Sequence, residues 1–240
     1  MSDGALLRAI DELYSAFAGV RKPRLPSNDP WRPDAEWIGS QPLREVPSAV
    51  INEFVNELPT GIIGDAEDVR YLTPRLMELA FRGELRTVID DDPILIALAL
   101  KRARWTEWSS REQAAIHAFL AEFLEWCVAG RQAPTLMALV TALAILFDDL
   151  APWLARIRAH QDVPGVCALL WIAESIVDDA FLDNRGEQRA QIRAWLREPA
   201  SLRQVDAVKD RVGLIGPDGE HLQWLFEGVA HWLTVRAAEP

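Results

Sequence analysis

Carboxylates are the side chains in this chain whose spacing could support chemistry. Four of them fall within one expected helix: Glu174, Asp178, Asp179 and Asp183. Glu174 and Asp178 are four positions apart and therefore share a helix face. Together with Asp148 and Asp149, these groups could hold Mg²⁺ between two helices. The paired Glu-x-x-His units of di-iron bundles and a DDxxD sequence are both absent, so we favour a solvated acidic face or a docking surface for arginines and lysines.

The other reactive side chains form no recognisable catalytic motif. His221 and His231 are ten positions apart and do not form the i, i+4 pair of a metal site, and an ordinary helix contact explains the spacing of Glu227 and His231. The chain contains no GxSxG, no HExxH and no glycine-rich phosphate loop. Cys127 and Cys167 lie in apolar helical patterns, which predicts two buried free thiols. We therefore expect no cofactor and no resident metal.

The charge balance constrains the partners of this protein. Acidic residues outnumber basic ones by 36 to 25, which gives a formal net charge of -11 and a pI of about 4.9. Nucleic acid and anionic membranes would be repelled, whereas a basic protein would be attracted. The start of the chain, MSDGALLRAIDELYSAF, has helical rather than signal-peptide spacing, so we expect a cytoplasmic protein.

Hydrophobic periodicity predicts helices along most of the chain and essentially no sheet. The central one is Ala133 to Phe147, fifteen residues without a charge. A helix of that length rises roughly 22 Å, which is short of the ~30 Å core of a bilayer, so we interpret it as a buried helix of a soluble bundle. The other expected helices cover residues 3–18, 47–58, 65–81, 90–104, 109–130, 150–160, 166–182, 187–197, 202–212 and 220–237.

The expected fold is one all-α domain over residues 1–240, either a multi-helix bundle or a HEAT-like stack of antiparallel helix pairs. Residues 20–47 carry several prolines and predict an extended arm, with Trp31, Trp37 and Ile38 as anchors on the bundle. The chain holds ten tryptophans against two tyrosines, and we expect these rings chiefly to fill gaps between helices.

The segment RYLTPRLMEL, residues 70–79, is followed by Trp105, Trp108, Glu112 and the apolar positions 115, 116, 119 and 120. This pattern resembles that of uncharacterised all-helical proteins of bacteria, and we extend the expectation to toxin-immunity proteins. The resemblance covers about sixty residues, a quarter of the chain, and implies a bacterial helical protein without any catalytic residue. Within it, we expect Tyr71 and Trp105 in the core, and Arg70 and Arg75 as surface cations paired with Glu67 or Glu78.

These observations favour a non-enzymatic protein that binds a basic partner. The most concrete form is an immunity protein that neutralises a cognate toxin by binding it, because charge complementarity speeds association. A metal-dependent helical hydrolase and a chaperone or adaptor for a secreted protein remain the alternatives. The candidate partner-binding residues are Asp65, Glu67, Asp68, Asp90, Asp91, Asp92, Asp148, Asp149, Asp178, Asp179 and Asp183.

Overall fold

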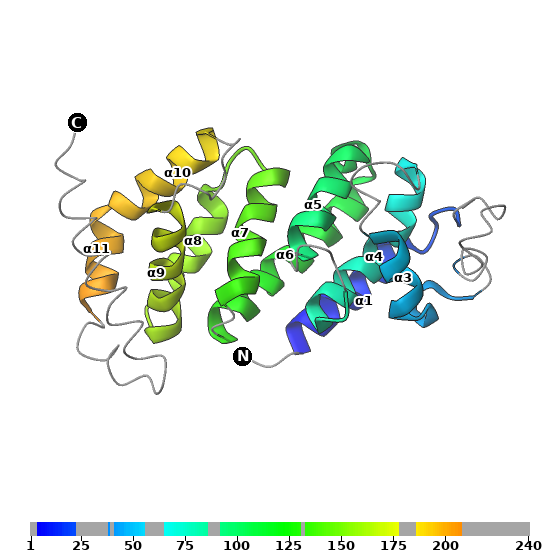
Figure 1. Cartoon of the computed structure of the whole chain (residues 1–240), viewed down its shortest axis with the longest axis horizontal. Helices are drawn as coiled ribbons and strands as arrows, with labels where there is room; N and C mark the ends of the chain where they lie inside the picture. The colour runs from blue at the N-terminus through cyan, green and yellow to red at the C-terminus, as the bar shows by residue number, and fades with distance from the viewer. Residues whose placement is uncertain are drawn as a thin grey trace. The chain divides into compact units, whose positions relative to one another are not determined.

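The computed structural model describes residues 4–22, 38, 41–55, 65–85, 92–130, 133–177 and 186–207. All regular secondary structure in these ranges is helical and no strand occurs among them, which confirms the expected all-α, multi-helix fold. Figure 1 shows the helices and their order along the chain. Within these ranges, every helix is too short or too polar to cross a membrane.

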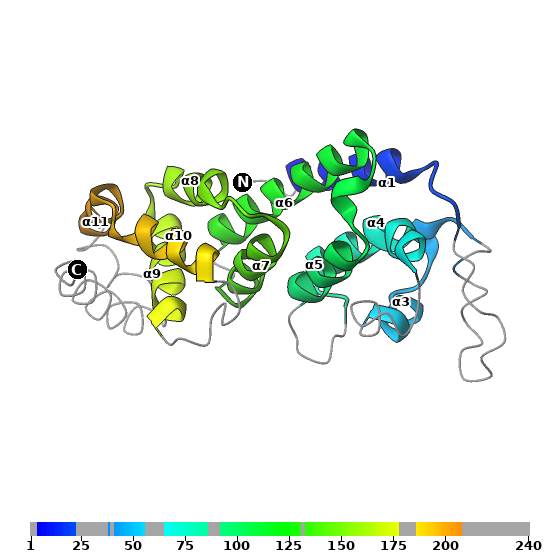
Figure 2. The same ribbon diagram turned by 90° about the horizontal axis from the view of Figure 1, so that it is seen from above.

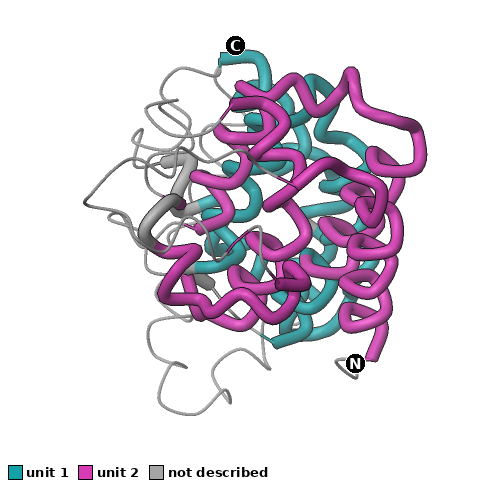
Figure 3. The backbone as a smooth tube through the Cα atoms, turned by 90° about the vertical axis from the view of Figure 1, so that its right-hand side faces the viewer, with its two compact units in different colours: residues 1, 124–240 teal, residues 2–123 magenta. Residues whose placement is uncertain are grey.

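The chain divides into two compact units, which are coloured separately in Figure 3. Unit 2 comprises residues 2–123, and unit 1 comprises residue 1 and residues 124–240. The boundary falls within a single helix, α6 (Ser110–Gly130). Whether residues 1–240 behave as one domain, as the sequence suggests, stays a prediction.

Unit 2 is organised around one helix, α4, which lies beside α1 and α5 (Figure 2). The Asp65 carboxylate caps the start of α4, and Gly83 ends it with a φ of 64°, a conformation that glycine adopts without steric cost. Pro74 lies inside this helix, as expected from the sequence. The elements of unit 2 are α1 (Gly4–Phe17), η1 (Leu43–Glu45), α3 (Ser48–Val55), α4 (Ala66–Arg82), α5 (Asp92–Arg102), η2 (Trp105–Glu107) and the first part of α6.

Unit 1 is organised around α9, which packs against α7, α8, α10 and α11. A close approach fixes the start of α9, because a Cβ atom added to Gly165 would overlap the backbone oxygen of His160 at the end of α8. The elements of unit 1 are the rest of α6, α7 (Ala133–Leu146), α8 (Ala151–Ala159), α9 (Val163–Val177), α10 (Gly186–Arg197) and α11 (Pro199–Asp206).

Most core positions agree with the helical patterns in the sequence. Tyr71 and Trp105 are buried, as expected, and Cys127 and Cys167 are buried and are not part of a disulfide. Four of the described tryptophans are buried, which supports their expected role in packing: Trp105, Trp108, Trp153 and Trp195. Leu7 differs from this pattern: the apolar spacing of residues 3–18 predicts it on the same face as Leu6 and Ile10, but it is 43% exposed.

Parts of several expected elements lie outside the described residues. They are residues 23–37 and 39–40 of the proline-rich arm, including Trp31 and Trp37, the ends of expected helices at 3, 56–58, 90–91, 178–182 and 208–212, and the whole of the last expected helix at 220–237. Ile38 is described and is fully buried, in agreement with its expected role as an anchor.

Candidate binding surface

Asp65 and Glu67 are exposed at the start of α4, where the backbone is fixed by a reciprocal cap. The Asp65 carboxylate accepts hydrogen bonds from the backbone N–H groups of Glu67 and Asp68, at 2.8 and 3.0 Å. In return, the Asp68 carboxylate accepts one from the Asp65 N–H at 2.9 Å. This arrangement holds the Asp65 carboxylate in one place and leaves the Glu67 side chain 58% exposed.

Asp68, another of the candidate partner-binding residues, is buried. Only 7% of it is exposed, and its carboxylate is turned back onto the helix start. Asp68 is buried because it is the third residue of α4. From that position an acidic side chain reaches the backbone N–H of the capping residue. Asp68 is thus a structural residue that positions Asp65.

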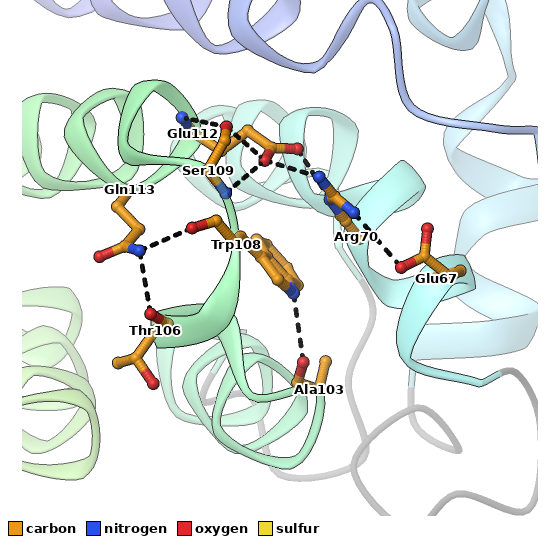
Figure 4. Close-up of polar contacts among 8 residues, drawn as sticks. All are labelled: Glu67, Arg70, Ala103, Thr106, Trp108, Ser109, Glu112 and Gln113. Atoms are coloured by element: carbon orange, nitrogen blue, oxygen red, sulfur yellow. Dashed lines mark hydrogen bonds and ion pairs between the residues drawn. The ribbon is translucent and has the colours of Figure 1, made fainter.

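An ion pair between α4 and α6 supports the same helix start, as Figure 4 shows. The Arg70 guanidinium donates two hydrogen bonds to the Glu112 carboxylate, from Nε and from Nη2, each 2.8 Å long. Its Nη1 atom also donates to Glu67 at 3.3 Å. The sequence indicated the pairing with Glu67 and missed the stronger one with Glu112, which is 42 positions away. Two parallel charge-assisted hydrogen bonds fix both distance and orientation.

Glu112 is buried and also caps its own helix. Its carboxylate accepts hydrogen bonds from the backbone N–H and the hydroxyl of Ser109, at 2.9 and 2.6 Å, while the Ser109 hydroxyl accepts from the Glu112 N–H. A serine at 109 or 110 before Glu112 is the sequence pattern of a capping box, and the structure forms it with Ser109. Burial tends to raise the pKa of Glu112, but the hydrogen bonds from Arg70 and Ser109 outweigh it, and the pKa is lowered.

The connection before α6 is held by two further side chains, also drawn in Figure 4. The indole Nε1 of Trp108 donates to the backbone oxygen of Ala103 at 3.2 Å. The Gln113 amide donates to the backbone oxygens of Thr106 and Trp108, at 2.9 and 2.8 Å. The connection is therefore fixed by hydrogen bonds rather than left to pack loosely.

Glu78 on α4 forms a second buried cluster in unit 2. Only 2% of it is exposed, and its carboxylate accepts hydrogen bonds from Tyr14, Arg75 and Arg82, at 2.7, 2.8 and 2.9 Å. Arg75 also donates to the backbone oxygen of Val46, which secures the segment after η1. Burial, followed by the hydrogen bond to Glu78, raises the pKa of Tyr14. Arg75 pairs with Glu78 as expected, but its side chain is only 11% exposed and is not a surface cation.

Asp148 and Asp149 of unit 1 are both exposed, in the connection between α7 and α8. The Gln191 amide of α10 donates to the Asp148 backbone oxygen at 2.6 Å, and its oxygen accepts from the Leu150 N–H at 2.8 Å. The Asp149 carboxylate accepts a hydrogen bond from the Ala151 N–H at 2.9 Å. Both carboxylates are thus carried on a backbone that a neighbouring helix holds in place.

A cleft of about 360 Å³ lies between α8 and α10 of unit 1. Its apolar lining consists of Ala151, Leu154, Ala155, Ala194 and Trp195. Its polar lining consists of Asp149, Arg158, Gln191 and Glu198. No local pattern in the sequence indicated this cleft, because its lining comes from two helices that are more than thirty positions apart.

The remaining candidate residues form no cluster within the described part of the chain. Asp92 is half-buried in the first turn of α5. Asp90, Asp91, Asp178, Asp179 and Asp183 lie outside the described residues, and so do His221 and His231. Within the described ranges, no three histidine, cysteine or acidic side chains are grouped so that they could hold a metal ion.

Comparison of this chain with protein families, with curated proteins and with solved structures gives no match.

Proposed function

We propose that this chain is an acidic protein-binding module, most concretely an immunity protein that neutralises a cognate toxin by binding it. The net charge of -11 supports this proposal. So does the exposure of Asp65, Glu67, Asp148 and Asp149, which the sequence singled out as contact groups. Charge of this sign attracts a basic protein and repels nucleic acid and anionic membranes.

The observation that carries the proposal is the fixed backbone beneath the exposed carboxylates. Asp65 is held by a reciprocal cap, and Asp149 accepts a hydrogen bond from the backbone of Ala151. A charged group that is already positioned loses little conformational freedom on binding, so more of its interaction energy appears as affinity. Charge complementarity also raises the association rate. Both properties suit a protein that must capture a toxin quickly.

The test begins with the partner. The tagged full-length chain is used to isolate bound proteins from extracts of its native host, and the captured protein is purified and measured by calorimetry at low and high salt. We expect a basic protein whose affinity falls as salt rises, because exposed charges are screened. Co-expression with that protein should also relieve any growth arrest that it causes.

Charge variants then test the surface itself. Asp65→Asn keeps a capping side chain and Glu67→Gln keeps the length of the side chain, and both should slow association with the captured partner. Glu107→Gln removes an equally exposed charge outside the candidate set and serves as the matched control. A salt-independent affinity would contradict the proposal. A rise in melting temperature with Mg²⁺ that is lost in Asp178→Asn would instead favour the hydrolase alternative.

A further inference from the structure

We infer that the cleft between α8 and α10 receives an arginine or lysine side chain of the partner protein. This inference rests on the proposed function and adds a specific docking site to it. The site differs from the acidic surface as a whole, because it combines an apolar lining with two carboxylates, Asp149 and Glu198, of which Glu198 is paired with Arg158. These are the features that recognise a long basic side chain, which has an aliphatic stem and a charged head.

The charges around the cleft leave one negative group available. The Arg158 guanidinium donates a hydrogen bond to the Glu198 carboxylate at 2.5 Å, so these two opposite charges offset each other. Arg158 also donates to the backbone oxygen of Trp195 and to the Ser201 hydroxyl, which fixes it against the wall. Asp149 forms no ion pair with any described residue. An incoming cation is therefore drawn to Asp149.

The dimensions and the lining fit a single side chain. A volume of about 360 Å³ lies at the lower end of the range for small-ligand pockets, roughly 300–1,000 Å³. The methyl groups of Ala151, Ala155 and Ala194 line the cleft and provide apolar contact for methylene groups. The guanidinium of Arg158 lies 5.2 Å from the centre of the Trp195 ring, so this cation-π position is already occupied. The carboxylate of Asp149 is thus the partner for the incoming head group.

Asp148 provides a matched control for Asp149. Both are exposed, they are adjacent in the chain, and their conversion to asparagine changes the net charge equally, but only Asp149 lines the cleft. Asparagine at position 149 can still accept the hydrogen bond from the Ala151 N–H, so the start of α8 is preserved. A similar pair exists for shape: Ala194 lines the cleft, whereas Ala159 is equally exposed on α8 outside it.

The first experiment titrates the full chain with a blocked peptide of sequence Gly-Ala-Arg-Ala-Gly and follows binding by NMR. The peptide is added to about 5 mM, because a weak single contact has a Kd in the millimolar range. The signals of Ala151 and Ala194 should shift. A peptide with citrulline in place of arginine has the same shape without the charge, and it should bind at least about fivefold more weakly, or about 1 kcal/mol. Absence of shifts, or equal binding of the citrulline peptide, would overturn the inference.

Variants of the chain distinguish binding in the cleft from attraction by the net charge of the protein. Asp149→Asn should weaken peptide binding about fivefold or more and Ala194→Trp should abolish it, whereas Asp148→Asn and Ala159→Trp should change it less than about twofold. Equal weakening by Asp149→Asn and Asp148→Asn would show that net charge alone attracts the peptide, which overturns the cleft as a site. Retention of binding in Ala194→Trp would do the same.

Measurements on the partner isolated from the host separate failure of the docking site from failure of the proposed function. If it binds with a salt-dependent affinity that Asp149→Asn and Ala194→Trp leave unchanged, the docking site is wrong and the proposed function stands. If the peptide binds as expected but no basic partner exists, the cleft recognises cations and the proposed function fails. If the partner's affinity falls in both cleft variants and in neither control, the inference is supported.

Discussion

The helices α4 and α9 each lie at the centre of a unit, but they bury different kinds of side chain. The buried positions of α4 include Asp68, Thr73 and Glu78, and each of these makes hydrogen bonds to specific groups. Among the described side chains of α9, the fully buried ones are uncharged: Val166, Cys167, Ala168, Leu169, Leu170, Ile172 and Ala173. The central helix of unit 2 thus buries polar groups that have specific partners, whereas the described buried side chains of the central helix of unit 1 are apolar.

Buried polar contacts and buried apolar contacts constrain helix packing in different ways. An apolar side chain is stabilised by any neighbour of suitable shape, whereas the Glu78 carboxylate needs Tyr14 of α1 and the arginines of α4. A shift of α1 along α4 would leave a buried charge with fewer partners, at a large cost in free energy. We therefore expect the polar contacts of unit 2 to define helix register, and the apolar contacts of unit 1 mainly to contribute stability.

The largest expected effect comes from Glu78→Gln. The substitution keeps the side-chain shape but leaves Arg75 and Arg82 without their buried counter-charge, so we expect a loss of about 4 kcal/mol in the free energy of unfolding. Urea unfolding of the full chain measures this loss. Glu67→Gln removes a charge from a side chain that is 58% exposed, and it should cost less than about 0.5 kcal/mol. A cost below about 1 kcal/mol at position 78 would contradict the claim that buried polar contacts of α4 are important for unit 2.

Leu170→Ala should cost about 3 kcal/mol, because it removes fully buried apolar atoms and leaves a cavity. The same urea unfolding measures it. Unlike the Glu78 penalty, this one should stay constant between neutral and acidic pH, since no charge is involved. Leu98→Ala is the control on a leucine that is 37% exposed, and it should cost less than about 1 kcal/mol. A strong pH dependence of the Leu170→Ala penalty would contradict the claim that α9 is stabilised by apolar contacts.

Acid should weaken unit 2 through Glu112. Its pKa is lowered in the folded protein, so its contribution to stability is present above its unfolded pKa, about 4.3, and is lost as the pH falls through the folded pKa. Glu112→Gln should therefore cost about 2 kcal/mol at pH 7 and progressively less below about pH 4. Urea unfolding over that pH range gives the comparison. Glu107→Gln, at a 66% exposed side chain, should parallel the parent protein throughout, and a pH-independent penalty at position 112 would contradict the assignment.

The smallest effect is expected from Ser109→Ala, about 1 kcal/mol, because the hydroxyl that caps α6 is lost. Ser110→Ala, at the next and equally exposed position, should change the free energy of unfolding by less than about 0.5 kcal/mol. Thermal unfolding is sensitive enough to separate the two variants. Equal effects would mean that the Ser109 hydroxyl adds nothing to the hydrogen bonds that Arg70 and the Ser109 N–H donate to Glu112.

Local patterns in the sequence were sufficient for the helices and their caps. The apolar spacing and the Asp65 and Ser109 caps act over a few residues, so both helix starts could be predicted. The burial of Asp68 could not be predicted from the local pattern, because it depends on the cap geometry. The Arg70 and Glu112 pair joins residues 42 positions apart, and the Tyr14 and Glu78 pair joins residues 64 apart. Contacts at such separations follow from how helices pack, which the local pattern does not contain.

The same limit applies to the candidate binding surface. The sequence identified both Asp148 and Asp149 but offered no reason to prefer either. The preference for Asp149 comes from the meeting of α8 and α10, which forms a cleft next to one carboxylate and not the other. Asp65 and Glu67, also candidates from the sequence, are exposed at the start of α4, where the helix dipole favours acidic groups.

Gly165 has an implication for how this gene can vary. Because a single methyl group there would displace the backbone at His160, even alanine forces the corner between α8 and α9 apart. A saturation library selected for folded protein should therefore retain glycine at this codon as strictly as it retains leucine at codon 170. The absence of a side chain can thus be as tightly selected as the presence of a large one.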